Sequence, residues 1–384
     1  MVNSQEFEEI RCFNDQETKE VLQRLVAEEM FLKMLETLFS GIPIDELKKK
    51  LLSFQTISDF QKGIVNPFLI GLEHKLTKGI SINGLNKINQ NKAQLYISNH
   101  RDIILDSAFL CSKLIENNLN TVEIAIGDNL LIYPWISDLV RINKSFIVRR
   151  GLNSRQILQS SEILSNYIAS TIQSKNQSIW IAQREGRAKD SNDTTQESLL
   201  KMFNMYGKNS LISNLALLNI CPLCISYEYD PCDFLKAKEF QLKRDNPEYT
   251  KSMSDDLINM QTGVLGYKGK IVYEVTGNID EELNSISARK LNKNEQLREI
   301  AQMIDKKIHS AYTIFPINMI AYDLLKNENR FVNEYSAEDL KEFDKYMSQQ
   351  LSRIEIENKD VEFLRTKLLE MYANPLINKI LSIS

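Results

Sequence analysis

The central part of the sequence alternates short apolar runs with longer stretches in which apolar residues recur at helical spacing. The short runs have the length and composition of β-strands, and the longer stretches predict helices between them. Such an alternation favours an α/β domain, in which a largely parallel sheet is flanked by helices on right-handed crossovers. The predicted strands are 79–85, 93–98, 121–127, 145–150, 178–182, 221–227 and 270–276.

Helical periodicity without strands occupies both ends of the chain. We therefore expect an N-terminal helical region at 1–77, an α/β domain at 78–290 and a C-terminal helical extension at 291–384. Residues 64–72 are the most apolar part of the N-terminal region. They are expected to pack against the α/β domain, and a membrane-facing helix is the alternative.

The charge and the cysteine content restrict the partners and the compartment. A net charge of −4 over 384 residues argues against bulk attraction to nucleic acid. No apolar run approaches the length that spans a bilayer, and the acidic, polar N-terminus does not resemble a signal peptide. Five cysteines, an odd number, point to a reducing compartment, so the expected location is the cytoplasm.

The cysteines also raise the question of a metal site. Cys221 and Cys224 have the spacing of a zinc knuckle, and Cys232 follows closely. No second pair and no nearby histidine completes a set of four ligands. The pair also lies in an apolar run that predicts a strand, so we expect no metal site.

The first candidate for chemistry is a histidine at a predicted strand-to-helix turn. His100 follows the strand at 93–98, and the carboxylates of Asp102 and Asp106 come next, where a helix begins. An imidazole oriented by a carboxylate is the usual general base for activating a hydroxyl. The alternative is a turn histidine followed by a helix cap, because so short a pattern also arises by chance.

Basic residues follow two other predicted strands. Arg149 and Arg150 end the strand at 145–150, and guanidinium groups there could bind phosphate oxygens. After the strand at 178–182, Glu185 and Gly186 are surrounded by Arg184, Arg187 and Lys189. Sites in open α/β sheets lie at such strand ends. The alternatives are a solvated basic edge and a surface ion-pair network.

Four blocks taken together resemble the glycerol-phosphate acyltransferase family, which includes the lysophosphatidate acyltransferases. They are Asn99-His100 with Asp106, Phe146-Ile147-Val148-Arg149, Glu185-Gly186-Arg187, and Pro222-Leu223 at the head of an apolar strand. Their order and approximate spacing agree with the family across residues 80–230. Three positions depart from it: five residues, not four, separate His100 from Asp106, Ala188 replaces a common arginine, and Asn143 replaces a common glycine.

The resemblance implies an O-acyltransferase of phospholipid biosynthesis. It would move an acyl group from a thioester, acyl-CoA or acyl-carrier protein, to a hydroxyl of glycerol 3-phosphate or a lysophospholipid. His100 would be the base and Asp106 its partner, with Asp102 left open, and no cofactor or metal is implied. The residues expected to bind substrate are Asn99, Arg101, Asp102, Phe146, Arg149, Arg150, Glu185, Gly186, Arg187 and Lys189.

Within this interpretation the product is a membrane lipid, so the protein would contact the inner face of the cell membrane peripherally. The aromatic and apolar segment 130–136 is a candidate for that contact, and core packing is its alternative. The apolar strand from Pro222 is a candidate wall for the acyl chain. Two other functions stay open: a lipid-binding protein without chemistry, and a phosphate-ester hydrolase that uses His100 and Asp102.

Overall fold

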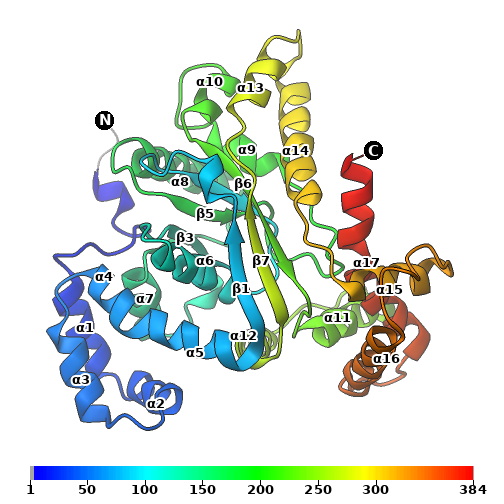
Figure 1. Ribbon diagram of the computed structural model, residues 1–384. Coiled ribbons are helices and arrows are strands. Elements are labelled where there is room, and N and C mark those ends of the chain that lie inside the picture. Colours follow the sequence, from blue (N-terminus) through cyan, green and yellow to red (C-terminus); the bar gives the residue numbers. More distant parts are fainter. Residues whose placement is uncertain (1–3, 384) are drawn as a thin grey trace.

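The computed structural model describes residues 4–383, and a seven-stranded sheet forms its centre (Figure 1). The strand order is β1-β7-β6-β2-β5-β3-β4. The strands are β1 (Thr77–Asn83), β2 (Leu95–Ser98), β3 (Glu123–Gly127), β4 (Ser145–Val148), β5 (Ile179–Ala182), β6 (Ile220–Tyr227) and β7 (Gly269–Val275). Each of the seven predicted strands is therefore present. Residues 1–3 of the predicted N-terminal region, and residue 384, lie outside the described part.

The sheet is largely parallel, as predicted. Every neighbouring pair runs parallel except β6 and β7, so β1 and β7 run against the other five strands. The residues of β2 are buried along its whole length, because helices cover both faces of the sheet. Tyr96 faces one layer of helices, whereas Leu95 and Ile97 face the other. Because both faces of β2 are buried, its sequence is a nearly continuous apolar run.

Two layers of helices cover the sheet (Figure 1). The layer on the Tyr96 face is made by α5 (Asn66–Leu76) and α6 (Leu105–Glu116). The layer on the other face is made by α8 (Ser154–Gln173), α9 (Glu197–Phe203), α10 (Leu211–Ala216), α13 (Asp280–Ser287) and α14 (Lys293–Ser310). Leu69 and Leu72 of α5 are buried in the first layer, as expected for residues 64–72, whereas Ile64 is buried in the core of the N-terminal helices.

The N-terminal helices form a cluster with its own apolar core, closed by Ile142 and Trp135 of α7 (Pro134–Ile142). They are α1 (Thr18–Ala27), α2 (Glu29–Leu38), α3 (Ile44–Ser53) and α4 (Ile57–Phe60), followed by a π-helical turn, η2 (Gln61–Val65). Three short 3₁₀ turns are η1 (Ser4–Phe7), η3 (Leu85–Lys87) and η4 (Asp128–Leu130). Residues 129–140 do not form one continuous helix, because Pro134 starts α7 after the turn η4.

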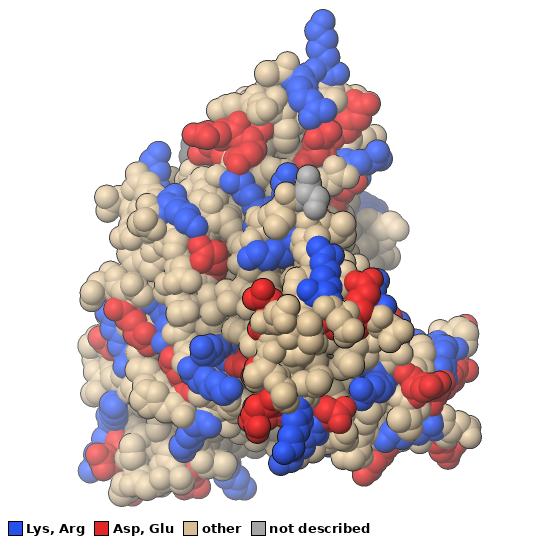
Figure 2. All heavy atoms as spheres, turned by 45° about the vertical axis from the view of Figure 1, so that its right-hand side comes forward, with Lys and Arg blue, Asp and Glu red and all other residues tan. Residues whose placement is uncertain are grey.

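The C-terminal helices form another cluster beside the sheet (Figure 1). They are α11 (Asp233–Asp245), α15 (Pro316–Lys326), α16 (Ala337–Ser352) and α17 (Val361–Ile383). Their outer face carries interspersed positive and negative side chains (Figure 2). The helix α11 was not predicted, because its buried face includes Asp233, Lys236 and Glu239, which hide the apolar period. The division of the chain at residues 77 and 290 stays a prediction.

The helix α12 (Met253–Leu265) lies directly against the turn that carries His100. A β-carbon on Gly263 of α12 would come within 2.2 Å of the Oδ2 atom of Asp102. Glycine at this position therefore permits the close approach of helix and turn. Among residues 4–383, each helix is too short or too polar to cross a bilayer.

Replacing Gly263 with alanine is expected to lower the free energy of unfolding by about 1–3 kcal/mol, because the added methyl group overpacks against Asp102. Gly71→Ala in α5 is the control, since a β-carbon there would have no described atom beyond its own helical turns within 4 Å, and alanine favours a helix by up to about 1 kcal/mol. Urea unfolding measures both. Equal stability changes in the two variants would contradict the close contact of α12 with the turn.

Asp233 at the start of α11 connects this helix to α16 and α17 through hydrogen bonds. Its Oδ2 atom accepts hydrogen bonds from the hydroxyls of Tyr346 and Tyr372, each at 2.6 Å. Burial raises the pKa of Asp233 to about 7, although the two tyrosines act to lower it. The folded protein therefore keeps a proton that the unfolded chain loses above its ordinary pKa near 4.

The stability that this proton confers is complete below about pH 4 and is lost as the pH rises through about 7. Asp233→Asn cannot ionise, so we expect its free energy of unfolding to decline less than that of the wild type over this range. Denaturant unfolding at several pH values measures the difference. Asp344→Asn, at an exposed site of α16, is the control, and a parallel decline in wild type and Asp233→Asn would contradict the assignment.

Candidate active site

His100 and Asp106 form a hydrogen-bonded pair at the carboxyl end of β2. The Nδ1 atom of His100 lies 2.8 Å from Oδ2 of Asp106, which is completely buried in the first turn of α6. The backbone amides of Arg101 and Asp102 donate to the same oxygen, at 2.6 and 3.1 Å. The carboxylate is therefore held in place, and it fixes which nitrogen of the imidazole faces it.

The turn accommodates the extra residue between His100 and Asp106. Oδ1 of Asp102 accepts hydrogen bonds from the amides of Ile104 and Leu105, at 2.9 and 2.8 Å. Asp102 therefore caps the turn that leads into α6, while Asp106 reaches back to the imidazole. Burial raises the pKa of Asp102, and the neighbouring charge of Asp106 adds to this shift. The structure thus puts Asp106, and not Asp102, on the ring of His100.

The neighbouring strands hold the His100 turn in position. The side-chain amide of Asn99 bridges to β6, because it donates to the carbonyl of Ile225 and accepts from its amide, both at 2.8 Å. The ring of Trp180 in β5 meets the His100 ring edge-on at 5.6 Å. Trp180 donates its indole N–H to the hydroxyl of Ser98 at 2.9 Å. Asn99 therefore joins two strands and does not line the cavity described below.

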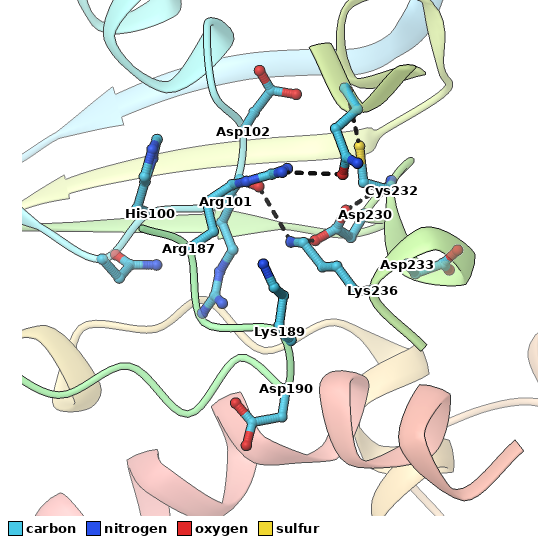
Figure 3. A network of polar contacts seen from close by, with 12 residues as sticks. His100, Arg101, Asp102, Arg187, Lys189, Asp190, Asp230, Cys232, Asp233 and Lys236 are labelled. Carbon is cyan, nitrogen blue, oxygen red and sulfur yellow. Dashed lines mark hydrogen bonds and ion pairs between the residues drawn. The ribbon is translucent and has the colours of Figure 1, made fainter. Parts of the chain in front are cut away.

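Two further residues expected to bind substrate lie away from the imidazole. Arg101 is buried, with Nη1 2.9 Å from Asp193 and Nη2 donating to the hydroxyl of Tyr312 at 2.8 Å, and its side chain runs away from His100 (Figure 3). Phe146 is buried in the core, with its ring 5.2 Å from that of Tyr167 on α8. Consecutive side chains of a strand face opposite sides of the sheet, and that of Phe146 faces the α8 layer.

A large cavity opens beside His100, with a volume of about 1360 Å³. Most of its wall is apolar and comes from α2, η2, α5, α6 and α7. Leu35, Ile64, Phe68 and Ala108 are examples of this lining. The strand β6 from Pro222 is not among the lining elements, so the expected acyl-binding wall at β6 is wrong. That strand lies between β7 and β2 in the sheet, and each of its residues is buried.

The other end of the cavity is rich in cations. Arg149 pairs with Glu9, and Arg150 pairs with Glu185, which precedes Gly186 at a backbone φ of +69°. All these residues except Glu9 line the cavity, together with Arg184. The amide of Arg150 also donates to Asp128 at 3.0 Å. The two basic stretches predicted from separate strand ends therefore meet at one wall.

Arg187 and Lys189 line the cavity from the same loop. Arg187 donates to Oδ1 of Asn259 on α12 at 3.0 Å, and its Nη1 atom is buried without a hydrogen-bond acceptor among the described residues (Figure 3). Lys189 lies 3.1 Å from Glu239 of α11. Burial lowers the pKa of Lys189 to about 8, although the charge of Glu239 acts to raise it. Both cations are therefore tied to helices beyond the loop.

All five cysteines are buried as free thiols. Burial raises the pKa of Cys221, Cys224 and Cys232 to about 12. Within residues 4–383 no three histidine, cysteine, aspartate or glutamate side chains gather as a metal site would require.

Two contributors to the cavity were missed from the sequence. The helix α2 lines it with Phe31, Met34, Leu35 and Leu38, and α12 lines it with Leu257, Met260 and Val264. The apolar residues of α2 recur at helical spacing in the sequence, but this periodicity does not predict which part of the protein they contact. The segment 130–136 also contributes, because Leu130, Trp135 and Ile136 lie on the cavity wall.

The four blocks lie within a segment that matches the model of a known protein family. Residues 79–226 match the family model described as Acyltransferase, which supports the predicted acyltransferase family over that segment. Among solved structures, the chain is similar to a 1-acyl-sn-glycerophosphate (LPA) acyltransferase, PlsC, from Thermotoga maritima, with 10% identity and a TM-score of 0.38. The alignment covers 77% of this chain and 96% of that one. No curated protein matches the sequence.

Proposed function

We propose that this protein is an O-acyltransferase that moves a fatty acyl group from a thioester to a hydroxyl of glycerol 3-phosphate or a lysophospholipid. The observation that carries the proposal is the 2.8 Å contact of His100 with Asp106 at the wall of a cavity that is apolar on one side and cationic on the other. A substrate with a hydrocarbon chain and a phosphate group would match both sides. The match of residues 79–226 to the acyltransferase model supports the same reaction class.

In the proposed reaction His100 acts as the general base. With Nδ1 engaged by Asp106, Nε2 takes the proton of the acceptor hydroxyl as its oxygen attacks the thioester carbonyl carbon. The tetrahedral intermediate then collapses, the C–S bond breaks, and the imidazolium returns the proton to the leaving thiolate. The products are an ester and a free thiol. Asp106 stabilises the imidazolium between the two proton transfers.

The acceptor phosphate would bind at the cationic end of the cavity. Arg149, Arg150, Arg187 and Lys189 supply the donors there, and Glu185 would orient the acceptor. Guanidinium groups suit this role because their paired N–H groups match two phosphate oxygens. Arg101, Asn99 and Phe146 are left out of this site, since their side chains are engaged inside the protein.

The acyl chain would occupy the apolar part of the cavity, between α2, α5, α6 and α7. Burying a methylene group from water is worth about 0.8 kcal/mol, so an apolar wall of this extent supplies substantial binding energy for a long chain. The N-terminal helices would then take part in the reaction by holding the donor or acceptor chain.

We further infer that the protein contacts the inner face of the cell membrane peripherally, where such acceptors reside. Four apolar residues on the cavity wall are more than a third exposed, which supports this contact. They are Ile104, Ile157, Leu257 and Leu265. Flotation with liposomes tests the inference, and protein that stays below the vesicles would contradict it.

The 2.8 Å contact of His100 with Asp106 weakens the alternative of a lipid-binding protein without chemistry. The five-residue spacing between His100 and Asp106 favours that alternative, but the turn capped by Asp102 accommodates the extra residue. A hydrolase that uses Asp102 is less well supported, because Oδ1 of Asp102 accepts hydrogen bonds from the amides of Ile104 and Leu105 and caps the turn.

Mass spectrometry of reaction products tests the proposed function. Purified protein is incubated with acyl-CoA or acyl-carrier protein and with glycerol 3-phosphate or lysophospholipids as acceptors. We expect a new ester together with a stoichiometric amount of free thiol. Thiol release without an ester would indicate thioester hydrolysis, and binding of lipid without either product would support the lipid-binding alternative.

A further inference from the structure

A buried carboxylate on α11 gathers three lysine side chains beside the cavity. Glu239 is nearly inaccessible, and it lies 3.1 Å from Lys189, 2.9 Å from Lys243 and 2.8 Å from Lys251. Lys189 comes from the Glu185 loop, and Lys251 lies just before α12. Because one carboxylate can neutralise one ammonium group, the cluster carries an excess of positive charge.

The three lysines differ in what they face. Lys189 and Lys251 line the cavity, with about a quarter of each side chain exposed, at 25% and 23%. Lys243 is outside the cavity wall and is 54% exposed. The excess positive charge therefore faces the cavity on the ammonium groups of Lys189 and Lys251, which both pair with Glu239. Asp256 is the acidic residue of α12 on the same wall.

Arg187 adds a second, independent sign of a ligand at this wall. Its side chain is more than nine-tenths buried, and its Nη1 atom has no hydrogen-bond acceptor among the described residues. A buried guanidinium nitrogen without an acceptor is costly unless a ligand supplies one. Arg149 and Arg150 differ from Arg187, because each of them has a carboxylate partner, Glu9 and Glu185 respectively.

We propose that Lys251 is a further acceptor-binding residue, which Glu239 holds beside Lys189 so that the two ammonium groups together bind one dianionic phosphate. This inference rests on the proposed function and extends it. Lys251 and Glu239 lie outside residues 79–226, so the matched segment alone does not contain the complete anion site. Glu239 is a positioning residue, because its carboxylate holds the side chains of Lys189 and Lys251 at the cavity wall.

Lys189 and Lys251, which we call the clamp, should distinguish acceptors by the charge of their phosphate group. A phosphate monoester carries a charge of about −1.5 to −2 at neutral pH, whereas a phosphodiester carries about −1. The second ammonium group therefore gains a full ion pair only with the monoester. Removal of Lys251 should cost a monoester acceptor more than a diester acceptor.

The test compares Lys251→Gln with Lys243→Gln, which removes a lysine from the same carboxylate outside the cavity wall. The acceptors are 1-acylglycerol 3-phosphate and a lysophosphatidylglycerol with the same acyl chain. In Lys251→Gln we expect kcat/KM for the monoester to fall roughly tenfold or more through KM, and that for the diester to change little. Lys243→Gln should match the wild type, and Lys251→Arg should recover most of the loss.

Equal losses for the two acceptors in Lys251→Gln, or the same loss in Lys243→Gln, would overturn the clamp and leave the proposed function standing. Failure of the wild type to acylate these two acceptors and glycerol 3-phosphate would overturn the proposed function itself. In that case calorimetric binding of glycerol 3-phosphate decides the clamp: weaker binding by Lys251→Gln than by Lys243→Gln supports it, and equal binding rejects it.

Discussion

Replacing His100 with alanine should leave a folded protein whose rate of acyl transfer is lower by roughly 10²–10⁴-fold. The loss follows from the removal of the group that takes the hydroxyl proton, while Asp106 stays anchored by the amides of Arg101 and Asp102. Product formation from a thioester and a lysophospholipid measures the rate. Circular dichroism and urea unfolding establish that the variant is folded.

His74→Ala is the matched control, because His74 lies on the exposed part of α5, away from the cavity wall. It should retain the activity of the wild type. If His100→Ala transferred acyl groups at the rate of His74→Ala, another group would have to be the base. The 2.8 Å contact with Asp106 would then be a structural one.

Replacing Arg101 with methionine should lower the free energy of unfolding by about 3–5 kcal/mol, because it leaves Asp193 as a buried charge without its partner. The expected defect is therefore one of stability, even though Arg101 directly follows the proposed base. Urea unfolding measures it. An additional Asp193→Asn substitution should restore part of the loss, since it removes the unpaired charge.

Arg149→Met is the control for this experiment. Its side chain is 42% exposed, so the ion pair with Glu9 contributes little to stability and we expect a change within about 1 kcal/mol. A stable Arg101→Met variant with a raised acceptor KM would instead return Arg101 to the substrate site. The pair of variants thus separates an arginine held in the interior from one that faces the cavity.

Some of the candidate site could be predicted because it follows from local rules. The strand at 95–98, the turn and the helix after it come from residues close together in the chain, which put His100 near both Asp102 and Asp106. The family resemblance favoured Asp106, and the structure pairs that residue with His100. Glu185, Gly186, Arg187 and Lys189 were placed at a strand end in the same way, and they do line the cavity. The ends of parallel strands meet at one edge of the sheet, which brings these blocks together.

Some residues expected to bind substrate lie away from the cavity because of the direction of their side chains. Asn99 and Arg101 flank His100, yet one bridges to β6 and the other pairs with Asp193, nearly a hundred residues away. Phe146 belongs to the same block as Arg149, but it is buried against α8, whereas Arg149 lines the cavity. Adjacent positions in a strand or turn point in different directions, so membership of a motif does not imply contact with the site.

The sequence by itself determined the seven strands, the largely parallel sheet and the position of His100 beside two candidate carboxylates, because these depend on apolar periodicity and on neighbours along the chain. Only the tertiary structure decided what surrounds them. The apolar wall from α2 and α5, and the anchoring of Lys189 and Lys251 by Glu239, join segments far apart in the chain. An amphipathic stripe or a charged side chain has many possible partners, and packing selects one of them.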